Sequence, residues 1–252
     1  MTNYLLTLRY DGRNFCGYQI QLTANGEKRT VGGELKKAIL SVFGTVEKLS
    51  GCSRTDSGVH STGYCVSFSS DKQLPEEVVV KALNAKLPRD ISVMSCRYVG
   101  DEFHARYSVV SKKYEYRIYS SPVRDPFKEG LWLHYPHKID EYLLKKAAKD
   151  FIGTHDFRSF MASGSKITDT VRTVYDADFY SVGENEYIYS VSANGFLYNM
   201  VRIMVGTLLD IQSGKRSSDS IPSIIESKNR SFSGHTAPPD GLYLCEVRYD
   251  KF

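Results

Sequence analysis

Residues 51–68 of the chain read Gly-Cys-Ser-Arg54-Thr55-Asp56-Ser57-Gly58-Val59-His60-Ser-Thr-Gly-Tyr64-Cys-Val66-Ser-Phe68. Asp-Ser-Gly is typical of a turn, because glycine permits a sharp bend and aspartate bonds the nearby backbone. After the turn, Tyr64, Val66 and Phe68 alternate with small residues, which is the period-2 pattern of a half-buried strand. The stretch therefore predicts that Asp56 stands where a loop enters a sheet.

Hydrophobic periodicity on both sides of this stretch predicts a β-α-β-β-α-β order in the first half of the chain. Thr30 is a typical N-cap for the first helix, and Gly44 ends it. The second helix begins at Pro75 and ends before Pro88. We expect strands at 4–10, 46–52, 62–68 and 91–98, and helices at 31–43 and 75–87.

The second half repeats the order, with strands expected at 113–120, 170–180, 187–193 and 242–249. Helices are expected at 139–151 and from Leu197 to an end near Gly214. A short helix at 221–227 is inserted before the last strand. The pattern predicts an α+β protein with two ferredoxin-like, or RRM-like, halves, 1–105 and 106–252. We expect the halves to join in one mixed, mainly antiparallel sheet, with helices on one face and a basic catalytic cleft on the other.

Composition sets weak limits on function. The 252 residues include 33 Lys and Arg against 29 Asp and Glu, a net charge of +4 that permits a polyanionic partner without requiring one. The 18 Tyr and 12 Phe include candidates for stacking on RNA bases. Five widely spaced cysteines with no Cys-x-x-Cys argue against a disulfide framework and against a zinc site. No signal peptide or membrane span is recognisable, so we expect a cytoplasmic protein.

Residue types alone leave the role of Asp56 open. It is most simply a turn residue that pairs with Arg54, two positions upstream. An aspartic protease would need a second Asp-Ser-Gly, and Pro239-Asp240-Gly241 lacks the hydroxyl residue. Hydrolysis by an acid pair would likewise need a second carboxylate of comparable specificity. A non-catalytic tandem RRM protein is a further alternative, because the same β-α-β-β-α-β unit builds RNA-binding modules.

The stretch resembles the signature of the tRNA pseudouridine synthase A family, which is close to Gly-Arg-Thr-Asp-Ala-Gly-Val-His. It departs from the signature at Ser53 and Ser57, both small-for-small changes. Other similar segments follow in the family's order, at 10–19, 111–117, 196–207 and 235–244. Tyr18 replaces the family's Trp, and Gly32 stands where Gln is common. These departures bear on which uridines would be modified.

The resemblance implies an isomerase that converts uridine to pseudouridine in the anticodon stem-loop of tRNA, at positions 38–40. The reaction breaks the bond from N1 to the ribose, turns the base and joins C5 to the same carbon. Because it is redox-neutral and consumes no water, we expect no cofactor and no metal. The family's members are homodimers with tRNA spanning both subunits, so a homodimer is implied here.

The resemblance also assigns roles to single residues. Asp56 is the catalytic carboxylate, acting as a nucleophile or as a base. Arg54 and Arg202 keep Asp56 ionised, and Arg54 fills the stack that the extruded base vacates. Tyr114 stacks on the target base and offers a proton acceptor, although by pattern alone it is an ordinary strand residue. By pattern alone Arg202 is a snorkelling residue of an amphipathic helix.

The remaining implied roles concern the base pocket and the RNA. Leu242 and Leu244 match the family's last motif and would line the base pocket. Two segments resemble the family's tRNA-contacting segments, the second only loosely. Their implied RNA-binding residues are Phe103, His104, Ala105, Arg106 and Tyr107 in the first segment, and Lys166, Thr168 and Arg172 in the second.

Overall fold

The structure is a computed structural model that describes residues 1–24, 26–165 and 167–250. The chain forms two compact units. Unit 1 comprises Met1–Val110 and the C-terminal segment that begins at Tyr243, and unit 2 comprises Ser111–Leu242. Both are α+β, as predicted. The division into functional halves at residue 105, the continuous sheet and the basic cleft stay predictions. None of the helices in the described ranges is long and apolar enough to cross a bilayer.

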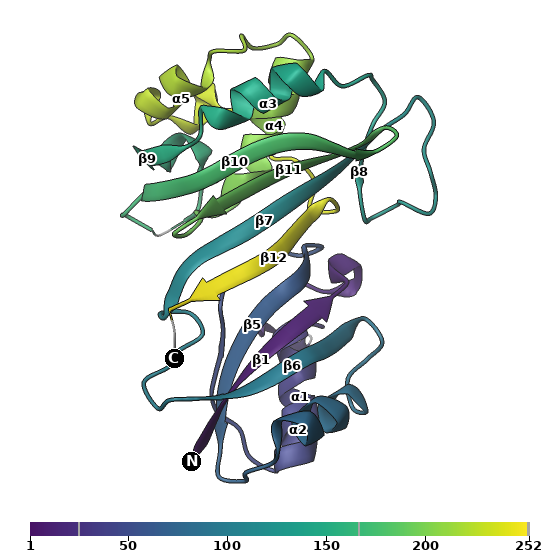
Figure 1. Cartoon of the computed structure of the whole chain (residues 1–252), viewed down its shortest axis with the longest axis vertical. Helices are drawn as coiled ribbons and strands as arrows, with labels where there is room; N and C mark the ends of the chain where they lie inside the picture. The colour runs from purple at the N-terminus through teal and green to yellow at the C-terminus, as the bar shows by residue number, and fades with distance from the viewer. Residues whose placement is uncertain (25, 166, 251–252) are drawn as a thin grey trace. The chain divides into compact units, whose positions relative to one another are not determined.

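Unit 1 is built on a mixed sheet in the order β6-β1-β5-β12 (Figure 1), with β4 paired to β5. Strand β1 pairs antiparallel with β5 on one side and β6 on the other. Strand β12 joins β5 in parallel, with Tyr243 opposite His60. The strands are β1 (Thr2–Tyr10), β4 (Glu47–Gly51), β5 (His60–Ser70), β6 (Ile91–Val99) and β12 (Leu242–Tyr249). The predicted order β-α-β-β-α-β is confirmed for this unit.

Helices α1 (Val31–Phe43) and α2 (Glu76–Asn84) pack on each other and against this sheet. The Thr30 hydroxyl accepts the Gly33 N–H at 3.2 Å, and Gly44 ends α1 at a φ of 82°. Both predicted boundaries of α1 are therefore confirmed. The core beneath it is aromatic, since the rings of Tyr4 and Phe68 stack with centroids 4.9 Å apart.

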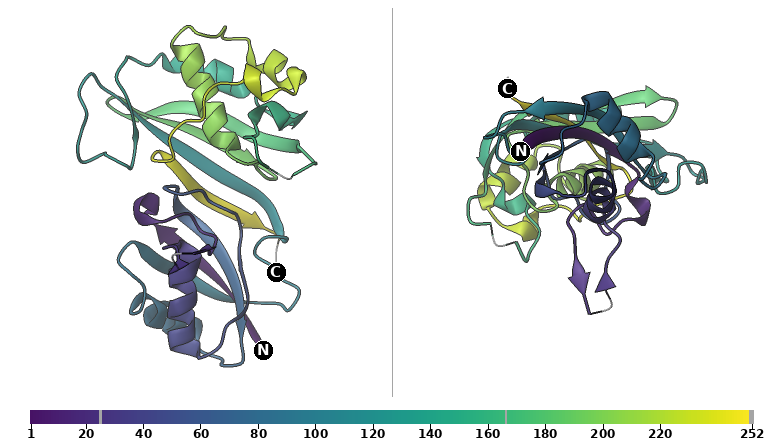
Figure 2. Two further views of the ribbon diagram at one scale, coloured as in Figure 1. Left: turned by 180° about the vertical axis from the view of Figure 1, so that it is seen from behind. Right: turned by 90° about the horizontal axis from the view of Figure 1, so that it is seen from below.

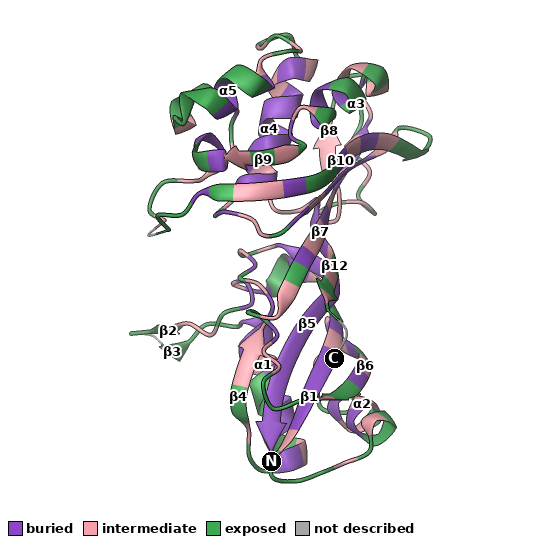
Figure 3. Ribbon diagram, turned by 60° about the vertical axis from the view of Figure 1, so that its left-hand side comes forward, coloured by how far each residue is buried: buried purple, intermediate pink, exposed green. Residues whose placement is uncertain are grey.

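Two short elements of unit 1 escaped the sequence analysis. The 3-10 turn η1 (Gly12–Asn14) follows β1, and a two-stranded hairpin of β2 (Leu22–Thr23) and β3 (Gly26–Glu27) comes before α1. The hairpin stands clear of the rest of the unit (Figure 3), and its strand residues are exposed. Two-residue strands are too short to show any hydrophobic period.

The strands of unit 2 follow the order β7-β11-β10-β9, with neighbours antiparallel. The short strand β8 pairs in parallel with β7. Buried residues alternate along β7 at Tyr114, Tyr116, Ile118 and Ser120, as the period-2 pattern predicts. The strands are β7 (Val109–Ser120), β8 (Leu133–Tyr135), β9 (Gly153–Asp156), β10 (Val171–Gly183) and β11 (Glu186–Ala193). Strands β8 and β9 were not predicted.

Three α-helices complete unit 2: α3 (Glu141–Lys149), α4 (Met200–Gln212) and α5 (Ile221–Ser227). The view from behind in Figure 2 shows α4 lying across the strands of its own unit. It is buried on nearly all sides, with Arg202, Asp210 and Gln212 only half-buried. Two short 3-10 turns, η2 (Phe157–Phe160) and η3 (Arg230–Phe232), lie in the connections.

Candidate active site

Asp56 lies in the loop between β4 and β5, as the first residue of the β-turn 56–59. Its carbonyl accepts the Val59 N–H at 3.2 Å, and Gly58 has a φ of 81°. A positive φ at the third position is what a type II turn requires, and it is why glycine occurs there. The Asp56 side chain is half-buried, Thr55 is buried and Arg54 is exposed. Asp56 thus stands where the loop enters β5, as predicted.

The segment Gly12–Tyr18 holds this turn from the opposite side. The Phe15 carbonyl accepts the Gly58 N–H at 3.3 Å and the Ser57 hydroxyl at 3.1 Å. A Cβ on Gly12 would lie only 2.1 Å from the Val59 carbonyl oxygen, so the two backbones touch. Any larger residue at position 12 would force them apart. The family-like segment at 10–19 therefore forms the support of the Asp56 turn.

Buried polar side chains fix the rest of the loop. The Tyr10 and Thr55 hydroxyl oxygens lie 2.9 Å apart, and Tyr64 donates to the Ser53 carbonyl. Burial raises the pKa of Tyr64 well above its ordinary value, so Tyr64 is a neutral donor. His60 Nδ1 accepts the Gly12 N–H at 3.1 Å. The sequence analysis predicted none of these three contacts, because each partner is distant along the chain or is a backbone group.

Arg202 is the third residue of α4 in unit 2. Its Nε donates to the Ala237 carbonyl at 2.7 Å, and its Nη1 donates to Asn199 Oδ1 at 2.8 Å. Asn199 has a φ of 60°, which asparagine tolerates better than most residues. Two neutral acceptors, the Ala237 carbonyl and the Asn199 amide oxygen, thus help to orient the Arg202 guanidinium.

Tyr114 lies on β7 and is 6% exposed. Its ring packs edge-on against Phe196, with centroids 5.0 Å apart. The neighbouring Tyr116 donates its hydroxyl to the Pro238 carbonyl at 2.7 Å. Burial and the Asp240 carboxylate raise the pKa of Tyr116, while Arg202 acts to lower it. Tyr116 is accordingly neutral, and the base-stacking role of Tyr114 stays a prediction.

The two leucines of the last motif are both buried. Leu242 begins β12 and belongs to unit 2. Leu244 lies opposite Ser61 in unit 1, and its carbonyl accepts the Ser61 hydroxyl at 2.5 Å. Their expected place in a base pocket stays a prediction.

The first segment expected to contact RNA is a turn anchored through Ala105. The Ala105 N–H donates to Ser67 Oγ at 3.0 Å, and its carbonyl accepts the Tyr249 hydroxyl at 2.8 Å. Arg106 and Tyr107 are exposed, with the guanidinium 5.7 Å from the centre of the ring. His104 lies against the same ring, and Phe103 packs on Tyr249. The anchored turn thus presents the exposed Arg106 guanidinium and the exposed Tyr107 ring.

The second expected segment is described at Thr168 and Arg172. Thr168 is exposed, and Arg172 is half-buried at the start of β10. Its Nη1 lies 3.8 Å from Asp169 Oδ1, so an acid partly offsets the Arg172 charge. Lys166 lies outside the described residues. The RNA-binding role of this segment stays a prediction.

Comparison with known proteins identifies the family. The model of the tRNA pseudouridine synthase family matches residues 7–108 and 147–250, more than half of the chain. Tyr114 lies between the matched segments, whereas Asp56 and Arg202 lie within them. The crystal structure of a Cbf5-Nop10-Gar1 complex covers 96% of this chain and 48% of its own, with 10% identity and a TM-score of 0.40, a likeness too weak to argue from.

Relatives named tRNA pseudouridine synthase A align over almost the whole chain. The protein from Lacticaseibacillus casei (strain BL23) is 44% identical, covering 99% of this chain and 100% of the relative. The protein from Latilactobacillus sakei subsp. sakei (strain 23K) is 44% identical over 98% of both chains. The one from Bacillus subtilis (strain 168) is 42% identical over 97% of this chain and 98% of its own. The chain therefore belongs to the tRNA pseudouridine synthase family, and with it to the isomerases that form pseudouridine.

Proposed function

We propose that this protein isomerises uridine to pseudouridine in the anticodon stem-loop of tRNA, at positions 38–40, with Asp56 as the catalytic carboxylate. The observation that carries the proposal is the Asp56 turn. Its backbone is held by Phe15 and by the close contact of Gly12 with Val59, so the carboxylate is preorganised.

The chemistry requires an ionised carboxylate beside the ribose. Asp56 either attacks the anomeric carbon as the N1 bond breaks and is displaced when C5 bonds to that carbon, or takes a ribose proton and returns it to the ribose after C5 has bonded. In both routes C5 loses its proton to a base, a role proposed for the Tyr114 hydroxyl, and N1 gains a proton, so that the product is an isomer of the substrate. Neither route oxidises or reduces the substrate, and the proposal includes no cofactor. Arg54 and Arg202 supply the positive charge that favours the ionised acid. Tyr114 and the leucines 242 and 244 complete the proposed set around the base.

The proposed substrate must be opened before it reacts, since a paired or stacked base cannot reach a carboxylate. The exposed Tyr107 ring and the Arg106 guanidinium are suited to single-stranded RNA, through stacking and phosphate contact. The second segment, with Lys166, Thr168 and Arg172, is proposed to contact the RNA as well. We further propose a homodimer that acts in the cytoplasm.

The test compares Asp56→Asn and Asp56→Ala with a control, Asp71→Asn. Asn preserves the turn chemistry of position 56 while removing the charge. Asp71 is exposed and directly follows the opposite end of β5. We expect both Asp56 variants to lose activity by at least about 10³-fold while still binding tRNA, and the control to keep both properties.

Pseudouridine mapping in tRNA from cells lacking the protein identifies the modified uridines. We expect the modification to be missing at 38–40 and restored by the natural chain but not by Asp56→Asn. Unchanged tRNA in these cells would refute the substrate. An active Asp56→Ala variant would refute the role of the carboxylate and return the tandem RRM alternative to consideration.

A further inference from the structure

Residues 233–238 run beside α4 as extended chain without helix or strand, and we call them the α4 strap. Despite its irregular backbone, the strap is bound along its whole length by groups of unit 2. An irregular segment held in this way has one conformation, because each buried backbone group needs its particular partner. The strap can therefore hold the groups that it contacts at its two ends in fixed positions.

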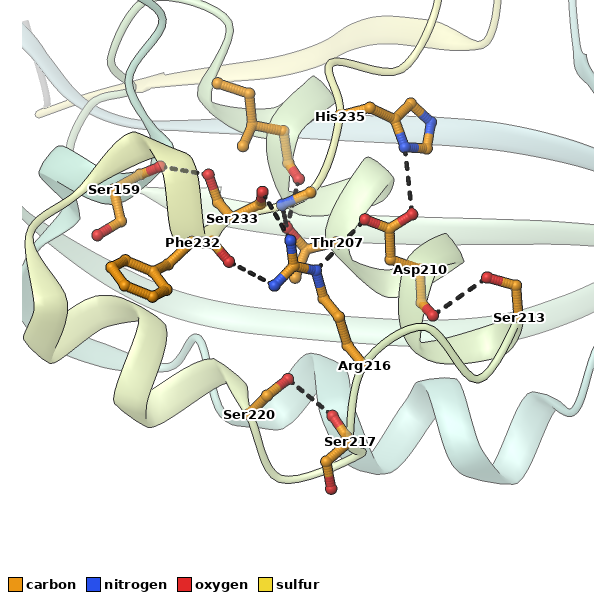
Figure 4. Close-up of polar contacts among 12 residues, drawn as sticks. Ser159, Thr207, Asp210, Ser213, Arg216, Ser217, Ser220, Phe232, Ser233 and His235 are labelled. Carbon is orange, nitrogen blue, oxygen red and sulfur yellow. Dashed lines mark hydrogen bonds and ion pairs between the residues drawn. The ribbon is translucent and has the colours of Figure 1, made fainter.

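At the end far from Arg202, Arg216 clamps the start of the strap (Figure 4). Its Nη1 donates to the Phe232 carbonyl at 2.5 Å, and its Nη2 donates to the Ser233 carbonyl at 3.0 Å. Asp210 on α4 accepts from Nε at 3.3 Å, which ties the clamp to the helix. The Ser233 hydroxyl donates in turn to the Ser159 carbonyl at 2.6 Å.

In the middle, the strap lies directly on the backbone of α4. Thr207 is fully buried, and its Oγ1 accepts the Gly234 N–H at 2.9 Å while donating to the Ile203 carbonyl at 2.8 Å. A Cβ on Gly206 would lie 1.9 Å from the His235 carbonyl oxygen. A Cβ on Gly234 would likewise lie 2.5 Å from the Thr207 nitrogen, so helix and strap approach this closely because both positions lack a side chain. Thr207 is thus the side chain that joins them at the closest point.

At the near end, the strap meets Arg202. The Ala237 carbonyl accepts from Arg202 Nε at 2.7 Å, and the Ala237 N–H donates to the Arg202 carbonyl at 3.1 Å. Tyr116 fixes the next carbonyl, that of Pro238. One of the acceptors that orient the guanidinium, the Ala237 carbonyl, therefore belongs to the strap itself. Moving the strap away from α4 would remove that acceptor.

We propose that Thr207 is a positioning residue for pseudouridine formation, acting through the α4 strap on the Arg202 guanidinium. This rests on the proposed role of Arg202 in the reaction. A long flexible side chain needs fixed acceptors to keep one direction, and small displacements of a catalytic charge are costly in rate. Thr207 lies five residues beyond Arg202 on α4 and acts without touching substrate.

The experiment uses the full chain and unmodified tRNA. Thr207→Val keeps the shape but removes the acceptor for Gly234, whereas Thr207→Ser keeps the hydroxyl. Ser120→Ala is the matched control, because Ser120 is buried in the same unit and donates to the His137 carbonyl at 2.8 Å. We expect Thr207→Val to lower kcat by about 10- to 100-fold with KM within about threefold. Thr207→Ser and Ser120→Ala should stay within about threefold of the natural kcat.

Two readouts separate positioning from general destabilisation. Amide exchange at Gly234 and Ala237 should accelerate in Thr207→Val, because their acceptors lie on α4, and should be unchanged in Ser120→Ala. In an Arg202→Gln background, Thr207→Val should cause little further loss of kcat, since a residue acting through Arg202 cannot act without it. Full additivity of the two losses, or a natural kcat in Thr207→Val, would overturn the proposal.

Arg216→Lys provides a second variant if Thr207→Val does not fold. Lysine keeps the charge but cannot span the two carbonyls as the guanidinium does. We expect the same loss of kcat and the same dependence on Arg202. An unchanged kcat would contradict the proposal that the strap positions Arg202. A fully active Arg202→Gln protein would refute the role of Arg202 itself, and so the proposed function at that residue. Loss in Arg202→Gln with no effect of either strap variant would refute only the inference drawn here.

Discussion

The hydroxyl oxygens of Tyr10 and Thr55 lie 2.9 Å apart, and both residues are buried. This contact joins the end of β1 to the residue directly before Asp56. Burying a hydroxyl that has a hydrogen-bond partner changes the folding free energy little, whereas a buried hydroxyl left without its partner destabilises the fold by about 1–3 kcal/mol. The backbone before Asp56 is therefore held by a hydrogen bond that is lost when either hydroxyl is removed.

Tyr10→Phe is expected to lower the free energy of unfolding by about 1–2 kcal/mol and kcat by about tenfold. The control is Tyr4→Phe, because the buried Tyr4 donates to the Lys72 carbonyl at 3.2 Å, at the other end of β1. It should lose comparable stability and keep its kcat. Urea unfolding and tRNA kinetics measure both quantities. Equal kcat in the two variants would show that the Tyr10 contact is only structural.

Gly17→Ala tests the close support of the Asp56 turn. The added Cβ would lie 2.4 Å from the Thr55 carbonyl oxygen, at a φ of 81° that side chains disfavour. We expect a loss of about 3 kcal/mol in the free energy of unfolding. Gly100→Ala is the control, because a Cβ there meets nothing within 4 Å, and it should change stability by less than about 0.5 kcal/mol. Thermal unfolding compares them, and similar melting temperatures would argue against the tight contact.

Arg106→Ala should weaken tRNA binding more at low salt than at high salt. If Arg106 neutralises one phosphate, the slope of log K against log salt should become less negative by about 0.7–0.9. Tyr107→Ala removes a stacking surface and should cost about 1–3 kcal/mol with an unchanged slope. Arg89→Ala, an exposed arginine elsewhere in unit 1, should leave both properties unaltered. Filter binding across a salt series measures these slopes. An unchanged slope for Arg106→Ala, or a changed slope for Tyr107→Ala, would contradict the prediction.

Acid stability should depend on Asp156. Burial tends to raise the pKa of this carboxyl, but the Thr170 hydroxyl at 2.5 Å, the Arg158 N–H and the Lys228 ammonium outweigh burial and hold the pKa below its ordinary 3.8. A depressed folded pKa stabilises the fold above the unfolded pKa, and this stabilisation is lost as pH falls through the folded value.

Asp156→Asn should therefore be less stable than the natural protein at pH 7, with a smaller further loss below about pH 4. Urea unfolding at several pH values between 3 and 7 measures the difference. Asp101→Asn, at an exposed acid in unit 1, is the control and should follow the natural profile. Parallel profiles for Asp156→Asn and the natural chain would show that the carboxylate is not stabilised in the fold.

Local patterns determined much of this protein before its structure was known. Helix α1 is bounded by Thr30 and Gly44, and α5 and β12 occupy the predicted residues 221–227 and 242–249. The Asp56 turn was readable because its glycine and aspartate are neighbours in the chain. Periodicity and turn chemistry act over a few residues, so a sequence displays them directly. Strands β8 and β9 were missed because three or four residues carry too little period.

Only the tertiary structure decided how the candidate catalytic side chains are supported. Thr55 meets Tyr10 across 45 positions, and Arg202 meets Ala237 across 35. No local propensity selects such partners, because they arise when sheets and helices pack and each buried polar group takes the nearest donor or acceptor. The sequence thus determined which residues are candidates for the chemistry, while long-range packing determined which acceptors the Arg202 guanidinium meets in unit 2.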